Sequence, residues 1–311
     1  MKMYYDVHGV KAIVRCEGKE DLFKKLNIDY GWFLAENKAE TTDFKFYVNY
    51  NVNSRNKGFV SLCGNNIYIN GNSFFFSGEH LDDDDFYVDD FRPYFTTAIY
   101  FCLYKNSRDI MIHSAAVDFD GRTVLFIGNS GCGKSSLLLR CVLDGCSYFS
   151  NDITYLSLDN GKVMAKALPQ ELNIGDQAYK WFDDNIKDFN KLCEEKTMKF
   201  LHKFEKKCIL PQSIKKDIKL KGKVTCVIFP EPMLKAEKPK IEKIPKSVAI
   251  RQMYQQIFPM YKRGYYPDIE GFALVDSLKN MLNVDNSIMF YNLYWCDNHE
   301  KNLEAIKSAV G

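Results

Sequence analysis

The spacing of hydrophobic residues predicts strands in the first part of the chain. Alternating apolar and polar positions, rich in aromatic and β-branched residues, occur at 10–14, 44–48 and 67–69. Turn-forming Asn and Gly residues separate these runs, as is typical of short antiparallel or mixed strands. A short helix is expected over 21–26. This pattern predicts a small β-rich domain that covers residues 1–90.

From residue 91 onward, strand and helix patterns mix along the chain. Asp120-Gly121 and Asp159-Asn160-Gly161 are strong hairpin signals between apolar runs. The expected strands are 110–119, 122–127, 147–150, 153–158, 162–167 and 224–229. The expected helices are 93–104, 135–143, 177–205, 247–258 and 300–310. We therefore expect an α/β domain with a mixed sheet over residues 91–311.

Composition and charge narrow the classes of function. Hydrophobic residues make up 46% of the 311 residues and charged residues 26%, which is typical of a globular protein. The net charge of +2 gives no overall basic footprint, so we expect no nucleic-acid partner. No apolar run reaches the roughly 18 residues of a membrane helix, and the first residues lack the apolar core of a signal peptide. Ten scattered cysteines without Cys-x-x-Cys spacing indicate reduced thiols in a cytoplasmic protein.

Two charged stretches have less specific interpretations. The acidic run over 82–90 is expected to be a solvated boundary segment. A basic stretch is expected to be mainly a solvated helix and loop, with an acidic peptide as the alternative occupant. Its lysines are Lys196, Lys199, Lys203, Lys206, Lys207, Lys215, Lys216, Lys219, Lys221 and Lys223.

A glycine-rich loop carries the strongest chemical signal. Residues 128–135 match the phosphate-binding pattern G-x-x-x-x-G-K-[ST] at every fixed position, after an apolar strand and before a helix. Glycines let the backbone N–H groups surround phosphate oxygens, Lys134 supplies charge, and Ser135 is placed to bind Mg²⁺. The sequence thus predicts binding of a phosphate donor with Mg²⁺, and ATP is the expected donor. GTP, pyrophosphate or another donor stays open, because such a loop recognises phosphates and not the base. The expected nucleotide-binding residues are Gly128, Asn129, Ser130, Gly131, Cys132, Gly133, Lys134, Ser135 and Ser136.

Phosphoryl transfer also needs a carboxylate near the loop. Asp152 is the best candidate, because it follows the first strand after the loop helix. His113 lies on the strand before the loop strand, and hairpin pairing can bring it near the phosphates. Taken alone, His113 is more typical of a packed strand histidine. Arg251, at the expected start of a helix, is more typical of a surface arginine than of a catalytic one.

Three segments together resemble the HPr kinase/phosphorylase family, a phosphoenolpyruvate-carboxykinase-like class of P-loop proteins. They are Ile112-His113-Ser114-Ala115-Ala116-Val117, the loop Gly128 to Ser136, and Gly145 followed by Tyr148-Phe149-Ser150-Asn151-Asp152. The resemblance implies that Lys134 binds the β- and γ-phosphates and that Ser135 holds Mg²⁺. It also implies that Asp152 accepts the proton of a substrate hydroxyl and that His113 is an active-site residue.

The chain also departs from this family. Asn151-Asp152 stands where the family usually has two aspartates, and the family's glycine-rich signature is absent after Pro169. Glu171 or Asp176 could replace the carboxylate of that signature. The reverse, phosphorylase reaction is therefore not expected. The chain is more similar to the family's short kinase-only relatives, some of which phosphorylate precursor peptides and one of which phosphorylates free serine.

These inferences predict a kinase that transfers the γ-phosphoryl group of ATP to a Ser or Thr hydroxyl of a protein or peptide. The catalytic residues are expected to be Asp152, His113 and Lys134. Two alternatives stay open, a kinase of small hydroxy-amino acids and a nucleotide-binding accessory protein that transfers no phosphate. Homo-oligomerisation is also left open.

Overall fold

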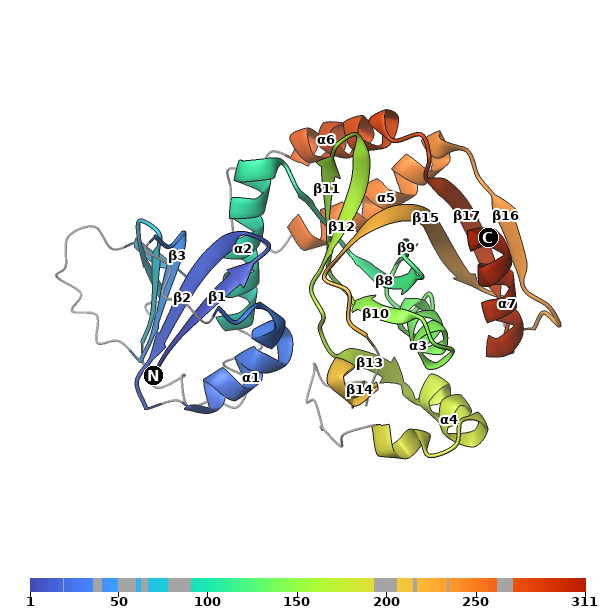
Figure 1. The fold of residues 1–311 in the computed structure, drawn as a ribbon, viewed down its shortest axis with the longest axis horizontal. Helices are drawn as coiled ribbons and strands as arrows, with labels where there is room; N and C mark the ends of the chain where they lie inside the picture. Colours follow the sequence, from blue (N-terminus) through green and yellow to red (C-terminus); the bar gives the residue numbers. More distant parts are fainter. Residues whose placement is uncertain are drawn as a thin grey trace. The chain divides into compact units, whose positions relative to one another are not determined.

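The computed structural model divides the chain into two units, residues 1–107 and 108–311 (Figure 1). It describes residues 1–18, 20–35, 41–49, 60–62, 67–77, 91–192, 206–214, 217–233, 235–261 and 271–311. The acidic run at 82–90 lies outside the described residues. The predicted boundary at residue 90 differs from this division, because the helix that follows it belongs to the first unit.

In the part of the chain that the structure describes, the first unit is a mixed six-stranded sheet with two α-helices and one 3₁₀ turn. The strand order is β1-β2-β3-β6-β5-β4. The strands are β1 (Lys2–Val7), β2 (Val10–Cys16), β3 (Phe44–Val48), β4 (Val60–Leu62), β5 (Ile67–Asn70) and β6 (Ser73–Phe76). The helices are α1 (Glu20–Tyr30), a 3₁₀ turn η1 (Gly31–Phe33) and α2 (Arg92–Ser107). The strands predicted at 10–14, 44–48 and 67–69 and the short helix predicted over 21–26 are confirmed, whereas β1, β4 and β6 were not foreseen.

Aromatic packing assigns α2 to this first unit. The ring of Phe95 lies 4.7 to 5.8 Å from the rings of Tyr5, Tyr30 and Phe46, measured between centroids. The hydroxyls of Tyr30 and Thr96 are hydrogen-bonded at 2.6 Å. Burial of such rings contributes roughly 1.5–3 kcal/mol each. The apolar side chains of α2 therefore complete the core of unit 1.

The second unit is a mixed α/β structure around one large sheet, with the order β10-β8-β9-β15-β12-β11-β7 and with β17 and β16 joined beside β15. Its strands are β7 (Ile110–Ile112), β8 (Ser114–Phe119), β9 (Arg122–Ile127), β10 (Ser147–Ser150), β11 (Thr154–Asp159), β12 (Lys162–Ala167), β15 (Lys221–Pro232), β16 (Lys240–Lys243) and β17 (Met289–Trp295). A separate pair is formed by β13 (Leu172–Gly175) and β14 (Lys206–Ile209). Since β9, β15 and β17 run parallel, their carboxyl ends meet at one edge of the sheet.

Helices pack around this sheet. They are α3 (Lys134–Leu143), α4 (Asp176–Asn185), α5 (Lys246–Tyr261), α6 (Gly271–Val284) and α7 (His299–Val310), with 3₁₀ turns η4 (Phe189–Leu192) and η5 (Pro211–Ile214). Leucines of α3 and apolar residues of β8, β9 and α7 share one buried cluster. Helix α5 lies against β7 and α6. The core thus fixes the start of α3 at the carboxyl end of β9.

One predicted strand is two strands. The expected strand 110–119 is interrupted at His113, so β7 pairs with β11 while β8 pairs with β9 and β10. Because β7 and β8 stand far apart in the strand order yet follow one another in the chain, the sheet curls back on itself. Hydroxyl contacts hold this region together, with Ser114 Oγ donating to Thr154 Oγ1 at 2.8 Å and Thr154 Oγ1 lying 2.6 Å from Ser150 Oγ.

The helix predicted over 177–205 is also shorter than expected. Helix α4 ends at Asn185, and Ile186 is extended. Asp183 and Asp184 place negative charge at the negative end of the helix dipole, which disfavours continuation. Residues 193–205 lie outside the described residues. The other helices and strands predicted after residue 91 are confirmed within a few residues at each end, whereas β13, β14, β16, α6 and β17 were not foreseen.

Candidate functional site

The glycine-rich loop connects the end of β9 to the start of α3. Gly131 and Gly133 have φ angles of 84° and 100°, which side chains rarely allow. A Cβ atom at Gly128 would lie 2.8 Å from Cys132 Sγ, so a larger residue here would force the Cys132 side chain to move. Helix α3 begins at Lys134, directly after the loop, and its first N–H groups carry the positive end of the helix dipole. The loop and this helix end can therefore receive an anion.

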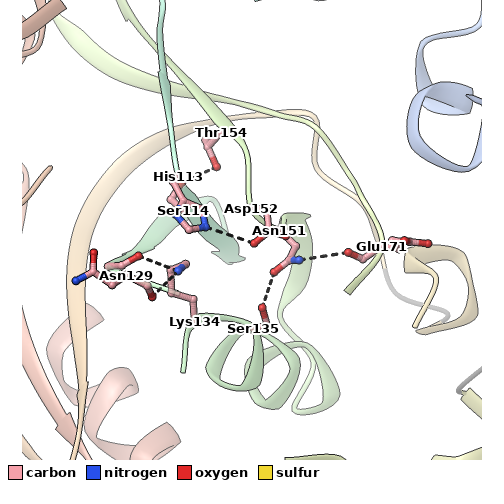
Figure 2. A network of polar contacts seen from close by, with 10 residues as sticks. His113, Ser114, Asn129, Lys134, Ser135, Asn151, Asp152, Thr154 and Glu171 are labelled. Carbon is pink, nitrogen blue, oxygen red and sulfur yellow. Dashed lines mark hydrogen bonds and ion pairs between the residues drawn. The ribbon is translucent and has the colours of Figure 1, made fainter. Parts of the chain in front are cut away.

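Lys134 points across the loop (Figure 2). Its Nζ donates to the carbonyl oxygens of Gly128 at 2.8 Å and Asn129 at 3.0 Å. The residue is only 5% exposed. A buried ammonium needs such partners, and phosphate oxygens are stronger partners than carbonyls. This geometry suits a lysine whose ammonium group leaves the loop carbonyls and binds phosphate oxygens when a phosphate enters the loop.

A hydrogen-bonded chain leads from Ser135 to the segment after β10 (Figure 2). Ser135 Oγ donates to Asn151 Oδ1 at 2.9 Å, and Asn151 Nδ2 donates to the carbonyl of Glu171 at 3.2 Å. A carbonyl oxygen can only accept a hydrogen bond, so the NH₂ group of Asn151 must face the Glu171 carbonyl. The side-chain oxygen of Asn151 then faces Ser135. Two neutral oxygens therefore face one another beside the loop.

His113 and Asp152 meet on the same side of the loop (Figure 2). His113 Nε2 lies 3.6 Å from Asp152 Oδ1. Asp152 has a φ of 67°, a left-handed conformation that Asp tolerates better than most residues, and its side chain is 50% exposed. His113 occupies the break between β7 and β8, and Asp152 the connection between β10 and β11. Both residues therefore lie where the chain crosses between the paired strands β8 and β10 and the paired strands β7 and β11.

Two further residues contact the loop that the sequence alone did not identify. Gln256 of α5 donates through Nε2 to Asn129 Oδ1 at 2.9 Å, and its carbonyl accepts the His113 N–H at 3.4 Å. Trp295, the last residue of β17, donates through Nε1 to the Cys132 carbonyl at 2.7 Å. Both contacts join positions more than 120 residues apart, so no local pattern signals them.

The structure brings the predicted catalytic residues His113, Lys134 and Asp152 to one region, around the loop. Other candidates lie elsewhere. Glu171 turns its carboxylate to Cys208 Sγ at 3.1 Å, and only its carbonyl reaches Asn151. Asp176 is exposed at the first turn of α4.

Arg251, the thiol of Cys132 and the basic stretch complete the set of charged or reactive groups. Arg251 is exposed in the second turn of α5, five residues from Gln256 and so about 140° around the helix from it. Burial raises the pKa of the Cys132 thiol despite the nearby Lys134, so the thiol stays protonated at neutral pH. Of the ten lysines, those at 196, 199, 203, 215 and 216 lie outside the described residues.

The chemistry of possible metal ligands is limited. Within the described ranges, no three His, Cys, Asp or Glu side chains cluster as a metal site. Ser135 Oγ and Asn151 Oδ1 are hard oxygen donors of the type that Mg²⁺ prefers. Among the helices of the described residues, none has the length and apolar character needed to cross a membrane.

Comparisons with known proteins find a distant structural similarity. No model of a known protein family matches the sequence, and a search of curated proteins finds no match. Among solved structures, the chain is similar to the HPr(Ser) kinase/phosphatase from Coxiella burnetii, with 11% sequence identity and a TM-score of 0.31. The similarity covers 64% of this chain and 93% of that one.

Proposed function

We propose that this protein is a kinase that transfers the γ-phosphoryl group of ATP to the hydroxyl of a Ser or Thr residue in a protein or peptide. One observation carries the proposal. The glycine-rich loop, with Lys134 at its end, lies beside both the Ser135–Asn151 pair and the His113–Asp152 pair. An anion site, a metal position and an exposed carboxylate next to one another are the parts that phosphoryl transfer needs.

The loop and Lys134 would bind the phosphates. N–H groups of the loop and of the first turn of α3 donate to phosphate oxygens, and Lys134 adds a positive charge. Ser135 Oγ and Asn151 Oδ1 would hold Mg²⁺, which neutralises charge on the β- and γ-phosphates when bound. Since Asn151 is neutral, the phosphates supply the negative charge for the metal.

Asp152 would act on the acceptor. Its Oδ1 lies 3.6 Å from His113 Nε2, so His113 would orient the carboxylate by drawing closer, and half of the side chain is exposed. The carboxylate can accept the proton of an incoming hydroxyl as the oxygen attacks the γ-phosphorus. An exposed base suits a hydroxyl carried on a polypeptide, because a bulky acceptor can approach it. A cytoplasmic location and the phosphoenolpyruvate-carboxykinase-like fold class belong to the same proposal.

The test is phosphate transfer from γ-labelled ATP with Mg²⁺ to a pool of peptides derived from a proteome. Two variants serve as controls. Lys134→Ala should weaken ATP binding, whereas Asp152→Asn should abolish most labelling and leave ATP affinity nearly unchanged. Labelled peptide that disappears with both variants would establish the activity and identify the acceptor.

Other outcomes select a different function. Labelling of free serine or another hydroxy-amino acid, without labelled peptide, would indicate a small-molecule kinase. ATP binding that Lys134→Ala weakens, without transfer to any acceptor, would indicate a nucleotide-binding accessory protein. The neutral Asn151 at the metal position is the observation that favours this last alternative.

A further inference from the structure

Trp295 contacts the glycine-rich loop at two points. Its Nε1 donates to the Cys132 carbonyl at 2.7 Å. A Cβ atom at Gly133 would lie 2.8 to 2.9 Å from three atoms of the indole ring, so the ring packs directly on this glycine. The peptide group between Cys132 and Gly133 is therefore held by both a hydrogen bond and van der Waals contact.

The orientation of this peptide group determines where the next N–H points. The described chain contains no cis peptide bond, so the Cys132–Gly133 peptide is trans and planar. In a trans peptide, C=O and N–H point in opposite directions. When Trp295 holds the Cys132 carbonyl on its own side, the Gly133 N–H faces away from Trp295.

We propose that Trp295 is a positioning residue that presets the Gly133 N–H toward the phosphate groups. The inference rests on the phosphate-binding role proposed above for the loop. Gly133, at φ 100°, has no side chain to restrict rotation of its peptide group. Without an external hydrogen bond, this peptide group would sample other orientations, and ordering it would weaken phosphate binding.

The position of Trp295 in the fold supports this role. It ends β17, which runs parallel to β15, and β15 runs parallel to β9. The indole therefore stands at the same edge of the sheet as the loop. The buried ring of His299 lies near the indole, with ring centroids 6.3 Å apart, and the indole packs against the buried core cluster of the second unit. The indole is thus supported by the fold and is not a freely rotating surface side chain.

The experiment measures binding of two ligands to the full chain by calorimetry. ATP with Mg²⁺ tests the whole nucleotide, and pyrophosphate with Mg²⁺ tests the phosphate site without a base. Trp295→Phe keeps a packed ring and removes the N–H donor. We expect about tenfold weaker binding of both ligands, the loss that one hydrogen bond causes. Trp181→Phe is the matched control, because Trp181 also packs on His299, at 4.3 Å between centroids, and should leave both affinities unchanged.

Three outcomes would overturn the inference. Unchanged pyrophosphate binding with weaker ATP binding would mean that the indole contacts the base. Equal losses for Trp295→Phe and Trp181→Phe would mean a general packing role. A wild-type chain that binds neither ligand would also exclude it. By contrast, a wild-type chain that binds both ligands but transfers no phosphate would disprove the proposed kinase activity and leave this inference standing.

A second measurement applies if Trp295→Phe fails to fold. The chain has three tryptophans, at positions 32, 181 and 295. In the Trp32→Phe/Trp181→Phe chain, Trp295 is the sole tryptophan, so its emission reports on the loop. Pyrophosphate with Mg²⁺ should change this emission with the same dissociation constant that calorimetry gives. Because the indole packs on Gly133, a charged ligand at the Gly133 N–H must alter its surroundings. Emission that stays constant while pyrophosphate binds would mean that the ligand lies elsewhere, and would contradict the proposal.

Discussion

Asn151 has a side chain that an aspartate cannot replace without cost. Its Nδ2 donates to the buried carbonyl of Glu171, and its Oδ1 accepts from Ser135. Asn151→Asp places a carboxylate oxygen against that carbonyl, and two acceptors then face each other. We expect the free energy of unfolding at pH 7 to fall by about 1–3 kcal/mol, measured by urea denaturation.

Asn185→Asp is the matched control for this prediction. Asn185 Nδ2 also donates to a backbone carbonyl, that of Trp181 at 2.7 Å, but it does so on the surface. Water can replace the lost donor there, and the added charge at the negative end of α4 costs a further fraction of a kcal/mol, so the expected total cost is below about 1 kcal/mol. Similar losses for the two variants would contradict the idea that the site is built for a neutral residue at position 151.

His299 should make stability depend on pH. It is 4% exposed and packs against the rings of Trp181 and Phe182, and burial lowers its pKa to about 4. The folded protein therefore binds a proton less readily than the unfolded chain, whose histidine has a pKa near 6.5. The contribution of His299 to stability is therefore full above pH 6.5 and falls by about 3 kcal/mol as the pH drops toward 4.

The His299→Gln variant separates this contribution from the other titrating groups. Free energies of unfolding at several pH values between 7 and 4 are compared with those of the wild type. The variant should show a shallower loss of stability with falling pH, because it has no imidazole to protonate. Parallel curves for the two proteins would refute the assignment.

At the scale of elements, Asp285 ties the end of α6 to β12. Its carboxylate accepts from Val163 N–H at 3.0 Å and from Ser287 Oγ at 2.6 Å, and Lys162 lies 3.5 Å away. Burial alone would raise the pKa of this carboxyl, but these donors and the lysine outweigh burial and lower it to about 2. The charged carboxylate is thus the form that the fold stabilises.

Asp285→Asn should weaken this connection. The Asn side chain has one acceptor oxygen, and its NH₂ group would face a donor with which it cannot hydrogen-bond. We therefore expect the free energy of unfolding at pH 7 to fall by about 1–3 kcal/mol. A lowered carboxyl pKa contributes stability above pH 3.8 that is lost as pH falls toward 2. The difference between wild type and variant in urea denaturation should therefore shrink over that range. A difference that does not depend on pH would argue against the charge of Asp285 as its origin.

Elements defined by short-range signals were predictable from the sequence. Asp120-Gly121 and Asn160-Gly161 have the positive φ angles that two-residue hairpin turns need, and both connect the strand pairs expected there. The order of the sheet was not predictable, because β15 joins β9 to β12 through contacts between distant parts of the chain. The break at His113 has the same origin, since the apolar pattern continues through it and only the pairing partners change.

In the candidate site too, residues within a local pattern could be predicted, whereas residues brought in from distant parts of the chain could not. The glycine-rich loop is a contiguous pattern, so Gly128 to Ser135 could be read directly. Asp152 was found because it follows the strand after the loop helix. Gln256 and Trp295 were missed because they reach the loop from α5 and β17, and neither residue type nor spacing distinguishes them from core residues.

At the scale of the whole molecule, the division at residues 107 and 108 assigns each half its own core. All residues of the candidate site, from His113 to Trp295, belong to the second unit. Helix α2 belongs to the first, where Phe91 and Phe95 pack on the rings of Phe46 and Phe76. A chain cut before α2 therefore carries apolar side chains away from the core that buries them.

Two truncated chains test this division. Residues 108–311 contain every element of unit 2, so this chain should fold. It should elute as a compact species in size-exclusion chromatography and keep helical circular dichroism. Residues 91–311 should aggregate or form higher oligomers, since Phe91 and Phe95, which are fully buried in the intact chain, would lose the aromatic rings of unit 1 on which they pack. If 91–311 were the well-behaved species and 108–311 failed to fold, α2 would be a structural part of the second unit and the boundary near residue 90 would be the physical one.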